Sequence, residues 1–125
     1  MPDWFEKTPI GELVDVAARR FKTKEALCYE GNRWTFGQLK DEVDRVASGL
    51  IQLGIHPGEK VALWMPNRPE WIHSLFAVAK IGAVLVPINT RFRTNDLEYV
   101  VRQSDSETLI TVDRSGPVDY LGMVR

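Results

Sequence analysis

The chain has 125 residues, a length that accommodates one domain. Its composition, 44% hydrophobic and 26% charged, is typical of soluble globular proteins and excludes an intrinsically disordered chain. With 16 Lys plus Arg against 17 Asp plus Glu, the net charge is -1, so no overall field attracts nucleic acid or an anionic membrane. The single cysteine excludes an internal disulfide and suits a reducing compartment. We therefore expect a compact cytoplasmic domain with no nucleic-acid partner.

The first predicted elements are an amphipathic helix and a small hairpin. Thr8 is the expected N-cap of the helix and Pro9 its first residue, because an N–H at the first position has no hydrogen-bond partner within the helix. Apolar residues at helical spacing form one stripe: Ile10, Leu13, Val14, Ala17 and Phe21. Two segments, 26–29 and 33–35, then flank a Gly-Asn pair at 31–32. This pattern predicts a β-hairpin that turns at the pair.

A second helix is predicted directly after the hairpin. Thr35 and Gln38 have the spacing of a capping box, in which each side chain satisfies a backbone N–H near the other residue. Gly54 supplies a left-handed stop and Ile55 the apolar contact that accompanies it. The expected buried face consists of Phe36, Leu39, Val43, Val46, Ala47, Leu50 and Leu53.

The remainder of the chain alternates short apolar runs, at 61–65, 83–88 and 108–112, with two helical segments. Asn67 is the expected N-cap of the first helix, which stops at Gly82, and the second opens at residues 95–98. Alternation of this kind predicts a parallel βαβαβ unit with right-handed crossovers. Because the runs are continuous rather than alternating, we expect strands that are covered on both faces. Residues 113–125 carry weak signals and are predicted to be a poorly defined tail.

The apolar stretch from Trp71 to Ile88 is long enough to suggest a membrane span. Lys80 and Gly82 lie at its middle and Pro87 near its end, so we interpret it as a buried helix, a stop and a strand. We expect no transmembrane segment.

Several chemistries lack the residues that they need. Neither a G-x-x-x-x-G-K-[ST] loop nor a G-x-G-x-x-G loop after a strand is present. His56 and His73 have no Cys, His or carboxylate at metal-ligand spacing. Cys28 is expected to be a small buried hydrophobe rather than a nucleophile. Asp41 is expected to pair with Arg45 on a solvated helix face. We therefore predict no metal site and no catalytic residue.

One group of residues indicates an anion site. Ligands of open parallel sheets bind outside the carboxyl ends of the strands. The three loops expected at those ends carry Arg68, Arg91, Arg93 and Arg114, with Asp96 and Asp113 nearby. We therefore expect a phosphate or carboxylate to bind there, with Arg91 and Arg93 as the residues to test. The alternative is that these arginines are merely solvated residues of surface loops.

Five segments, in order and at matching spacing, resemble the adenylate-forming superfamily, which includes the acyl-CoA synthetases. Residues 34–39, Trp-Thr-Phe-Gly-Gln-Leu, resemble its first conserved core, and residues 80–89 its second. Residues 57–63 and 66–71 are similar to a strand entry and a helix start of that family, and 97–111 to the segment that follows. The Asn-Thr-Arg-Phe sequence at 89–92 resembles acyl- or aryl-CoA ligases more than the peptide-synthetase branch.

The resemblance implies part of the large N-terminal domain of an ATP-dependent fatty-acid or aryl-acid CoA ligase. Such an enzyme transfers AMP from ATP, with Mg²⁺, to a carboxylic-acid substrate, and the CoA thiol then displaces AMP. Full-length enzymes of this kind use ATP, Mg²⁺ and CoA. Arg91 matches a position at which some relatives contact a CoA phosphate.

The family's phosphate loop, its adenine contacts and its catalytic lysine lie beyond residue 125. We therefore expect residues 1–125 to be a partial AMP-binding domain, without the catalytic core and C-terminal domain, inactive by itself and binding no cofactor alone. The alternative is a free-standing α/β binding or regulatory module that docks on another protein. A part of a larger domain should expose core-facing apolar residues and self-associate. The candidates for such exposure are Trp4, Phe5, Trp64, Tyr120, Leu121, Met123 and Val124.

Overall fold

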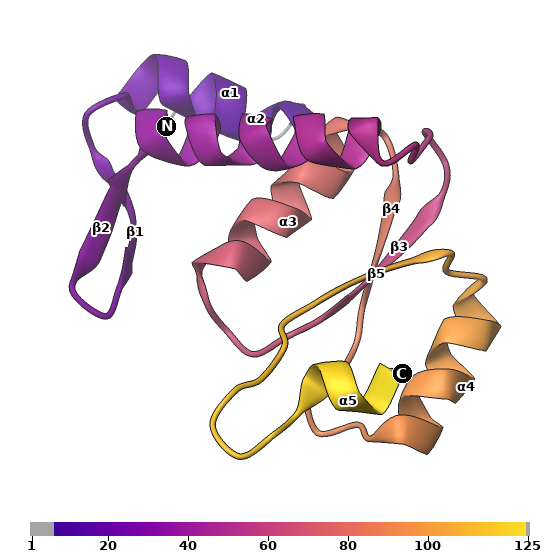
Figure 1. Cartoon of the computed structure of the whole chain (residues 1–125). Helices are drawn as coiled ribbons and strands as arrows, with labels where there is room; N and C mark the ends of the chain where they lie inside the picture. The colour runs from indigo at the N-terminus through magenta and orange to yellow at the C-terminus, as the bar shows by residue number, and fades with distance from the viewer. Residues whose placement is uncertain (1–6, 125) are drawn as a thin grey trace.

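The computed structural model describes residues 7–124. Its first half contains a helix, a hairpin and a longer helix: α1 (Ile10–Phe21), β1 (Glu25–Tyr29), β2 (Asn32–Thr35) and α2 (Phe36–Gln52). Its second half alternates strands and helices: β3 (Lys60–Trp64), α3 (Pro69–Lys80), β4 (Val84–Pro87), α4 (Thr94–Ser104), β5 (Thr108–Thr111) and α5 (Tyr120–Val124). The predicted α/β fold, a helix and hairpin followed by a parallel βαβαβ unit, is confirmed (Figure 1).

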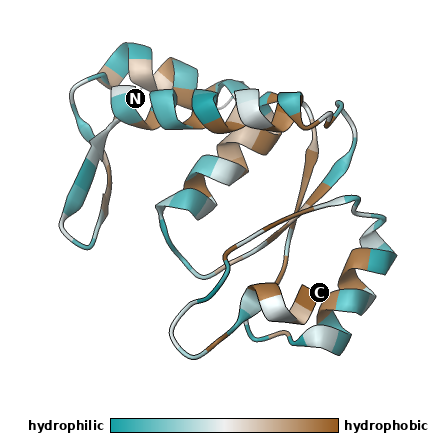
Figure 2. Ribbon diagram, viewed as in Figure 1, coloured by the Kyte–Doolittle hydropathy of each residue, from teal (hydrophilic) through white to brown (hydrophobic). Residues whose placement is uncertain are grey.

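The three strands of the second half form a parallel sheet in the order β4-β3-β5. Val61 of β3 lies opposite Leu85 of β4 and Thr108 of β5. Alternate residues of β3 enter two cores, with Val61 packed among α1, α2 and α3 and Ala62 packed beside α4 and α5. Figure 2 shows apolar residues on the strands and on the helix faces around them. Helices therefore cover both faces of β3, as its continuous apolar run predicts. The same expectation is wrong for β4, an edge strand on which Val84 is 47% exposed.

The limits of α2 follow from its capping residues. The amide of Gln38 donates to Thr35 Oγ1 at 3.2 Å and the amide of Thr35 donates to Gln38 Oε1 at 2.9 Å, so the predicted capping box is confirmed. At the other end Gly54 has φ 91°, and the Ile55 amide donates to the Leu50 carbonyl. The prediction that Leu53 belongs to the buried face of α2 is wrong. Leu53 is 75% exposed, because the helix ends at Gln52 and the chain then turns away from the core.

Two other predicted N-caps are wrong by one residue. Pro9, rather than Thr8, is the N-cap of α1, and Arg68, rather than Asn67, is the N-cap of α3. In α3 the reason is Pro69, which occupies the first helical turn and keeps Arg68 in extended backbone.

The hairpin turns one residue earlier than the sequence predicts. Glu30 and Gly31 have φ of 49° and 82°, and Asn32 pairs with Tyr29 instead of standing in the turn. Two consecutive positive φ angles match the twist of the strands, and glycine adopts the second of them without strain. Cys28 on β1 is exposed, so the expectation that it is buried is wrong.

Three helices meet where Lys80, near the end of α3, reaches α1 and α2. Its ammonium donates to Asp15 Oδ1 at 3.1 Å and to Asp44 Oδ1, and Lys40 bonds the other oxygen of Asp44 at 2.6 Å. The expected pair of Asp41 with Arg45 is replaced by a pair of Arg45 with Glu42 at 3.0 Å.

The segment predicted as a poorly defined tail contains ordered structure up to residue 124. Ser115 and Val118 exchange two backbone hydrogen bonds, and the Leu121 amide donates to the Asp113 carbonyl at 3.0 Å. These bonds bring α5 back over the end of β3 (Figure 1). Local sequence signals do not predict this return, because α5 has only five residues and is fixed by tertiary contacts.

Candidate functional site

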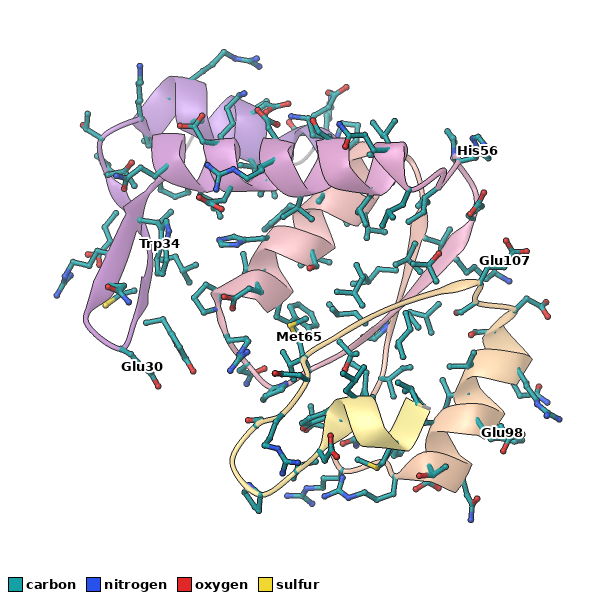
Figure 3. The ribbon with its side chains drawn as sticks, in the orientation of Figure 1. Glu30, Trp34, His56, Met65, Glu98 and Glu107 are labelled. Carbon is teal, nitrogen blue, oxygen red and sulfur yellow. The ribbon has the colours of Figure 1, made fainter. Side chains whose placement is uncertain are left out.

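The carboxyl ends of the three parallel strands lead into three loops, 65–68, 88–93 and 112–119. Parallel pairing places these ends at one edge of the sheet, where ligands of open α/β sheets bind. Figure 3 labels Met65, the first residue after β3, at this edge. The expected grouping of the loops is therefore confirmed.

The loop after β4 holds itself in one conformation. The Arg91 amide donates to Asn89 Oδ1 at 2.8 Å, and the Phe92 amide donates to the Asn89 carbonyl at 3.0 Å. The Arg93 guanidinium donates to the carbonyls of Thr90 and Phe92 at 3.0 and 2.9 Å. Arg93 therefore braces the loop that presents Arg91.

Arg91 and Arg93 thus have different roles in the same loop. The side chain of Arg91 is exposed and, among residues 7–124, has no hydrogen bond or ion pair. The backbone amide of Arg93 also donates to Asp96 Oδ2 at 3.3 Å, which ties the loop to the first turn of α4. Of the two predicted anion-binding residues, Arg91 has its guanidinium available for a ligand.

The loop after β5 neutralises its own arginine. Arg114 lies 3.4 Å from Asp119 in an ion pair, and its backbone amide donates to Asp113 Oδ1 at 2.7 Å. Because both partners are exposed, the pair is weak and an anion could compete for Arg114.

Arg68 belongs to a different surface. It lines a cavity together with hairpin residues Leu27 and Tyr29, whereas the start of α4 lies beside Met123 and Val124. Arg68 thus lies on the hairpin side of this edge, whereas Arg91 belongs to the loop before α4.

Two aromatic residues lie beneath the loops. Trp64, the last residue of β3, is fully buried, and Tyr120 of α5 is 3% exposed. Their ring centroids are 4.6 Å apart with planes at 72°, an edge-to-face contact. Both were expected to be exposed, and that expectation is wrong because α5 covers the end of β3. Leu121 and Val124 are exposed as predicted, whereas Trp4 and Phe5 lie outside the described residues.

His73 of α3 is a buried polar residue whose place in the core the sequence pattern does not predict. It is 6% exposed, its Nε2 has no partner among the described residues, and its ring meets Trp34 of β2 edge-on at 6.2 Å. Burial lowers the pKa of His73, although Glu42 and Glu70 oppose the shift. The neutral imidazole therefore packs against Trp34 of the hairpin.

Within residues 7–124 no group of three His, Cys, Asp or Glu residues is placed to hold a metal ion. Over the same residues, no helix has the length and hydropathy needed to cross a membrane.

The parallel sheet β4-β3-β5, with helices packed on both faces of β3, defines an α/β domain. The profile of the AMP-binding enzymes matches residues 14–122. The chain therefore belongs to the AMP-binding enzyme family.

Individual relatives agree with this assignment. The mitochondrial medium-chain acyl-CoA ligase ACSF2 of Mus musculus is 41% identical over 98 residues, which are 77% of this chain and 16% of the relative. The putative acyl-CoA synthetase YngI of Bacillus subtilis is 37% identical over 117 residues, which are 92% of this chain and 21% of the relative. The chain thus spans about a fifth of the length of these relatives.

A solved structure has the same fold. The N-terminal domain of FACL13 from Mycobacterium tuberculosis superimposes with a TM-score of 0.79 at 33% identity, over 82% of this chain and 26% of that domain. The fold and the sequence thus both match the N-terminal domain of an adenylate-forming enzyme.

Proposed function

We propose that this chain is the N-terminal portion of an ATP-dependent ligase that joins a fatty or aryl acid to CoA. The observation that carries the proposal is the 37% identity to an acyl-CoA synthetase over 92% of the chain. In such a reaction a carboxylate oxygen attacks the α-phosphorus of ATP and pyrophosphate leaves. The CoA thiol then displaces AMP from the acyl-adenylate to form the thioester.

The described residues fit one component of that chemistry better than the others. Arg91 offers an unpaired guanidinium on a braced loop, which suits a CoA phosphate. For ATP and Mg²⁺, the part of the chain that the structure describes supplies no carboxylate cluster. We therefore assign ATP, Mg²⁺ and the acid substrate to the full-length enzyme.

The Arg91 assignment is tested with adenosine 3′,5′-bisphosphate, which carries the CoA phosphate without the acyl chemistry. Titration by calorimetry should show weaker binding to Arg91→Ser than to the original chain. Arg93→Ser should weaken binding indirectly, because the loop loses the hydrogen bonds from the Arg93 guanidinium to its carbonyls. Arg33→Ser, on the hairpin, is the matched control. Equal affinity of Arg91→Ser and the original chain would refute the assignment.

We also propose that residues 1–125 form a partial domain that makes no acyl-adenylate alone. Incubation with ATP, Mg²⁺ and a fatty acid should release no pyrophosphate above a protein-free blank. Release that depends on the acid would overturn this proposal.

A free-standing binding module remains the second candidate, and one observation favours it. Trp64 and Tyr120, expected to be exposed in a part of a larger domain, are buried by this chain's own α5. Exposed apolar residues elsewhere support self-association instead, among them Leu53 at 75% and Ile51 at 60% exposure. Light scattering distinguishes the partial domain from the free-standing module. Association that depends on concentration would support the partial domain, and a stable monomer would support the module.

The cytoplasm is the compartment that we propose, on the basis of the single, exposed and unpaired Cys28. The mouse relative is mitochondrial by name. Cell fractionation with an antibody against this chain tests the proposal, and the mass of the captured protein shows whether it is several times heavier than 14.2 kDa.

A further inference from the structure

The β1–β2 hairpin rests on α3 through a narrow contact. The ring of Trp34 on β2 meets the ring of His73 on α3 edge-on, with centroids 6.2 Å apart. Beside this contact lie two cavities of about 320 and 310 Å³, and Leu27 of β1 and Ile72 of α3 line both of them. Protein cores contain few voids of this size, so the hairpin is packed less tightly on α3 than a core element would be.

The backbone of the hairpin is fixed at its base. The Phe36 amide donates to the Lys24 carbonyl at 3.0 Å, and the Gly37 amide donates to the Lys22 carbonyl at 3.1 Å. From this base the hairpin extends away from the end of α1 and the start of α2 (Figure 1), and its turn at residues 30–31 is exposed. Movement of the hairpin away from α3 would therefore break no pairing of the parallel sheet.

His73 is the titratable member of the contact. Its side chain is 6% exposed, and its Nε2 is buried without a hydrogen-bond partner among residues 7–124. A neutral imidazole carries one N–H and can leave Nε2 as a lone pair, whereas the imidazolium carries an N–H on both nitrogens. Protonation beneath the closed hairpin would therefore bury a charge and leave the Nε2–H without an acceptor, and both changes are unfavourable.

The charged groups around His73 do not remove this penalty. Glu42 of α2 and Glu70 of α3 favour the charged imidazole, but burial outweighs them and lowers the pKa of His73. Glu42 is already paired with an arginine of its own helix at 3.0 Å. On the hairpin, Glu25 and Arg33 pair with each other at 2.7 Å. The closed arrangement therefore favours the neutral imidazole.

We propose that the hairpin is a pH-sensitive flap, which the contact of Trp34 with neutral His73 holds on α3 and which proton uptake by His73 releases. Release exposes the imidazole to water, where its charged form is solvated. The released form therefore binds the proton more readily than the closed form, so acid increases the population of the released form. The flap does not depend on the proposed ligase function, because none of its residues belongs to the loop at 89–93.

Amide hydrogen exchange, measured by NMR on the whole chain, tests the flap. A two-stranded hairpin is marginally stable by itself, so its amides should lose protection once it leaves α3. The protection factor of each amide is its exchange rate relative to the intrinsic rate at the same pH. For residues 25–35 we expect this factor to fall by up to about tenfold per pH unit below pH 6.5.

Two further observations distinguish release of the hairpin from unfolding of the whole chain. At every pH the hairpin amides should be less protected than those of α2 and β3, because release is a smaller opening than global unfolding. The loss of hairpin protection should level off below the pH at which the NMR signals of the His73 imidazole themselves titrate.

His73→Phe keeps a ring against Trp34 but takes up no proton, so its hairpin protection should not vary with pH. His56→Gln, which removes the other, exposed histidine, is the matched control. If circular dichroism shows that His73→Phe is unfolded, the original chain decides, because protection that keeps falling past the His73 midpoint would assign the proton to another group.

Three results would overturn the proposal. The first is hairpin protection that is equal at pH 7.5 and 5.5, and the second is a pH dependence that persists in folded His73→Phe. The third is equal protection of the hairpin and β3, which would show that the hairpin opens only when the whole chain unfolds.

Discussion

Trp64 at the end of the central strand meets Tyr120 of α5 edge-to-face, with ring centroids 4.6 Å apart. The indole Nε1 has no hydrogen-bond partner among the described residues, so Trp64 is held by its packing, including this aromatic contact. The pair joins the last helix to the sheet and closes the second core over Ala62 and Leu97.

Removing the Tyr120 ring should therefore destabilise the chain strongly. We expect Tyr120→Ala to lower the free energy of unfolding by about 3 kcal/mol, because it leaves a cavity over Trp64. Urea denaturation followed by tryptophan fluorescence measures the change. Leu121→Ala, at a 36% exposed position of the same helix, is the control and should cost less than about 1 kcal/mol. Equal losses for the two variants would contradict the role of the aromatic contact.

His73 should make stability depend on pH. Burial lowers the pKa of His73 below 6.5, against the opposing charges of Glu42 and Glu70. The unfolded chain therefore binds the proton more readily than the folded chain. The stabilisation is complete above pH 6.5 and is lost as the pH falls from there toward the folded-state pKa.

Thermal melts between pH 8 and 5 check this expectation. His73→Phe keeps a ring against Trp34 and should flatten the profile in this range. His56→Gln, at an exposed position outside the helices, is the control substitution of the other histidine. A sloping profile that survives in His73→Phe would assign the proton uptake to other groups.

Two glycines in helices should respond oppositely to alanine. A Cβ on Gly11 would lie 2.6 Å from the Ala79 carbonyl oxygen, where α1 crosses α3. We expect Gly11→Ala to destabilise by about 1–3 kcal/mol through overpacking. A Cβ on Gly49 of α2 meets nothing within 4 Å, so Gly49→Ala should stabilise by about 0.5–1 kcal/mol. Chemical denaturation of both variants tests the signs, and stabilisation by Gly11→Ala would refute the close helix crossing.

The Lys80 cluster should matter more than an exposed ion pair. Its side chains are 25–36% exposed at Asp15, Lys80 and Asp44. We expect Lys80→Met to cost about 1–2 kcal/mol, between the values for surface and buried pairs. Arg102→Met removes the exposed pair with Glu98 and should cost less than about 0.5 kcal/mol. A loss for Lys80→Met no greater than the loss for Arg102→Met would show that the cluster is merely solvated.

The same cluster predicts acid sensitivity. Burial opposes the charged form of Asp44, but hydrogen bonds from Lys40 and Lys80 outweigh it and lower the pKa of this carboxyl below 3.8. Its stabilisation is present at neutral pH and is lost as the pH falls below 3.8 through the folded-state pKa. Asp44→Asn should therefore lose stability at pH 7 but show a smaller further loss in acid, measured by circular dichroism.

Local signals in the sequence were enough to determine the elements with strong caps or periodicity. Thr35, Gln38 and Gly54 define α2 because a helix must satisfy its terminal N–H and carbonyl groups close by in the chain. The continuous apolar runs predicted β3, β4 and β5 as the strands of a parallel unit. The resemblance of five segments within residues 34–111 to the adenylate-forming superfamily predicted the family, and the profile match over residues 14–122 confirms it.

Tertiary structure decided what depends on residues far apart in the chain. Three features have no local signal: the burial of Trp64 by Tyr120, the half-buried Arg68 in the lining that it shares with Leu27, and the packing of His73 against Trp34. Arg91 and Arg93 differ in their hydrogen bonds only in the folded loop, where the guanidinium of Arg93, and not that of Arg91, donates to backbone carbonyl oxygens. Caps and periodicity act over a few residues, whereas burial and pairing depend on how distant segments are placed by the whole fold.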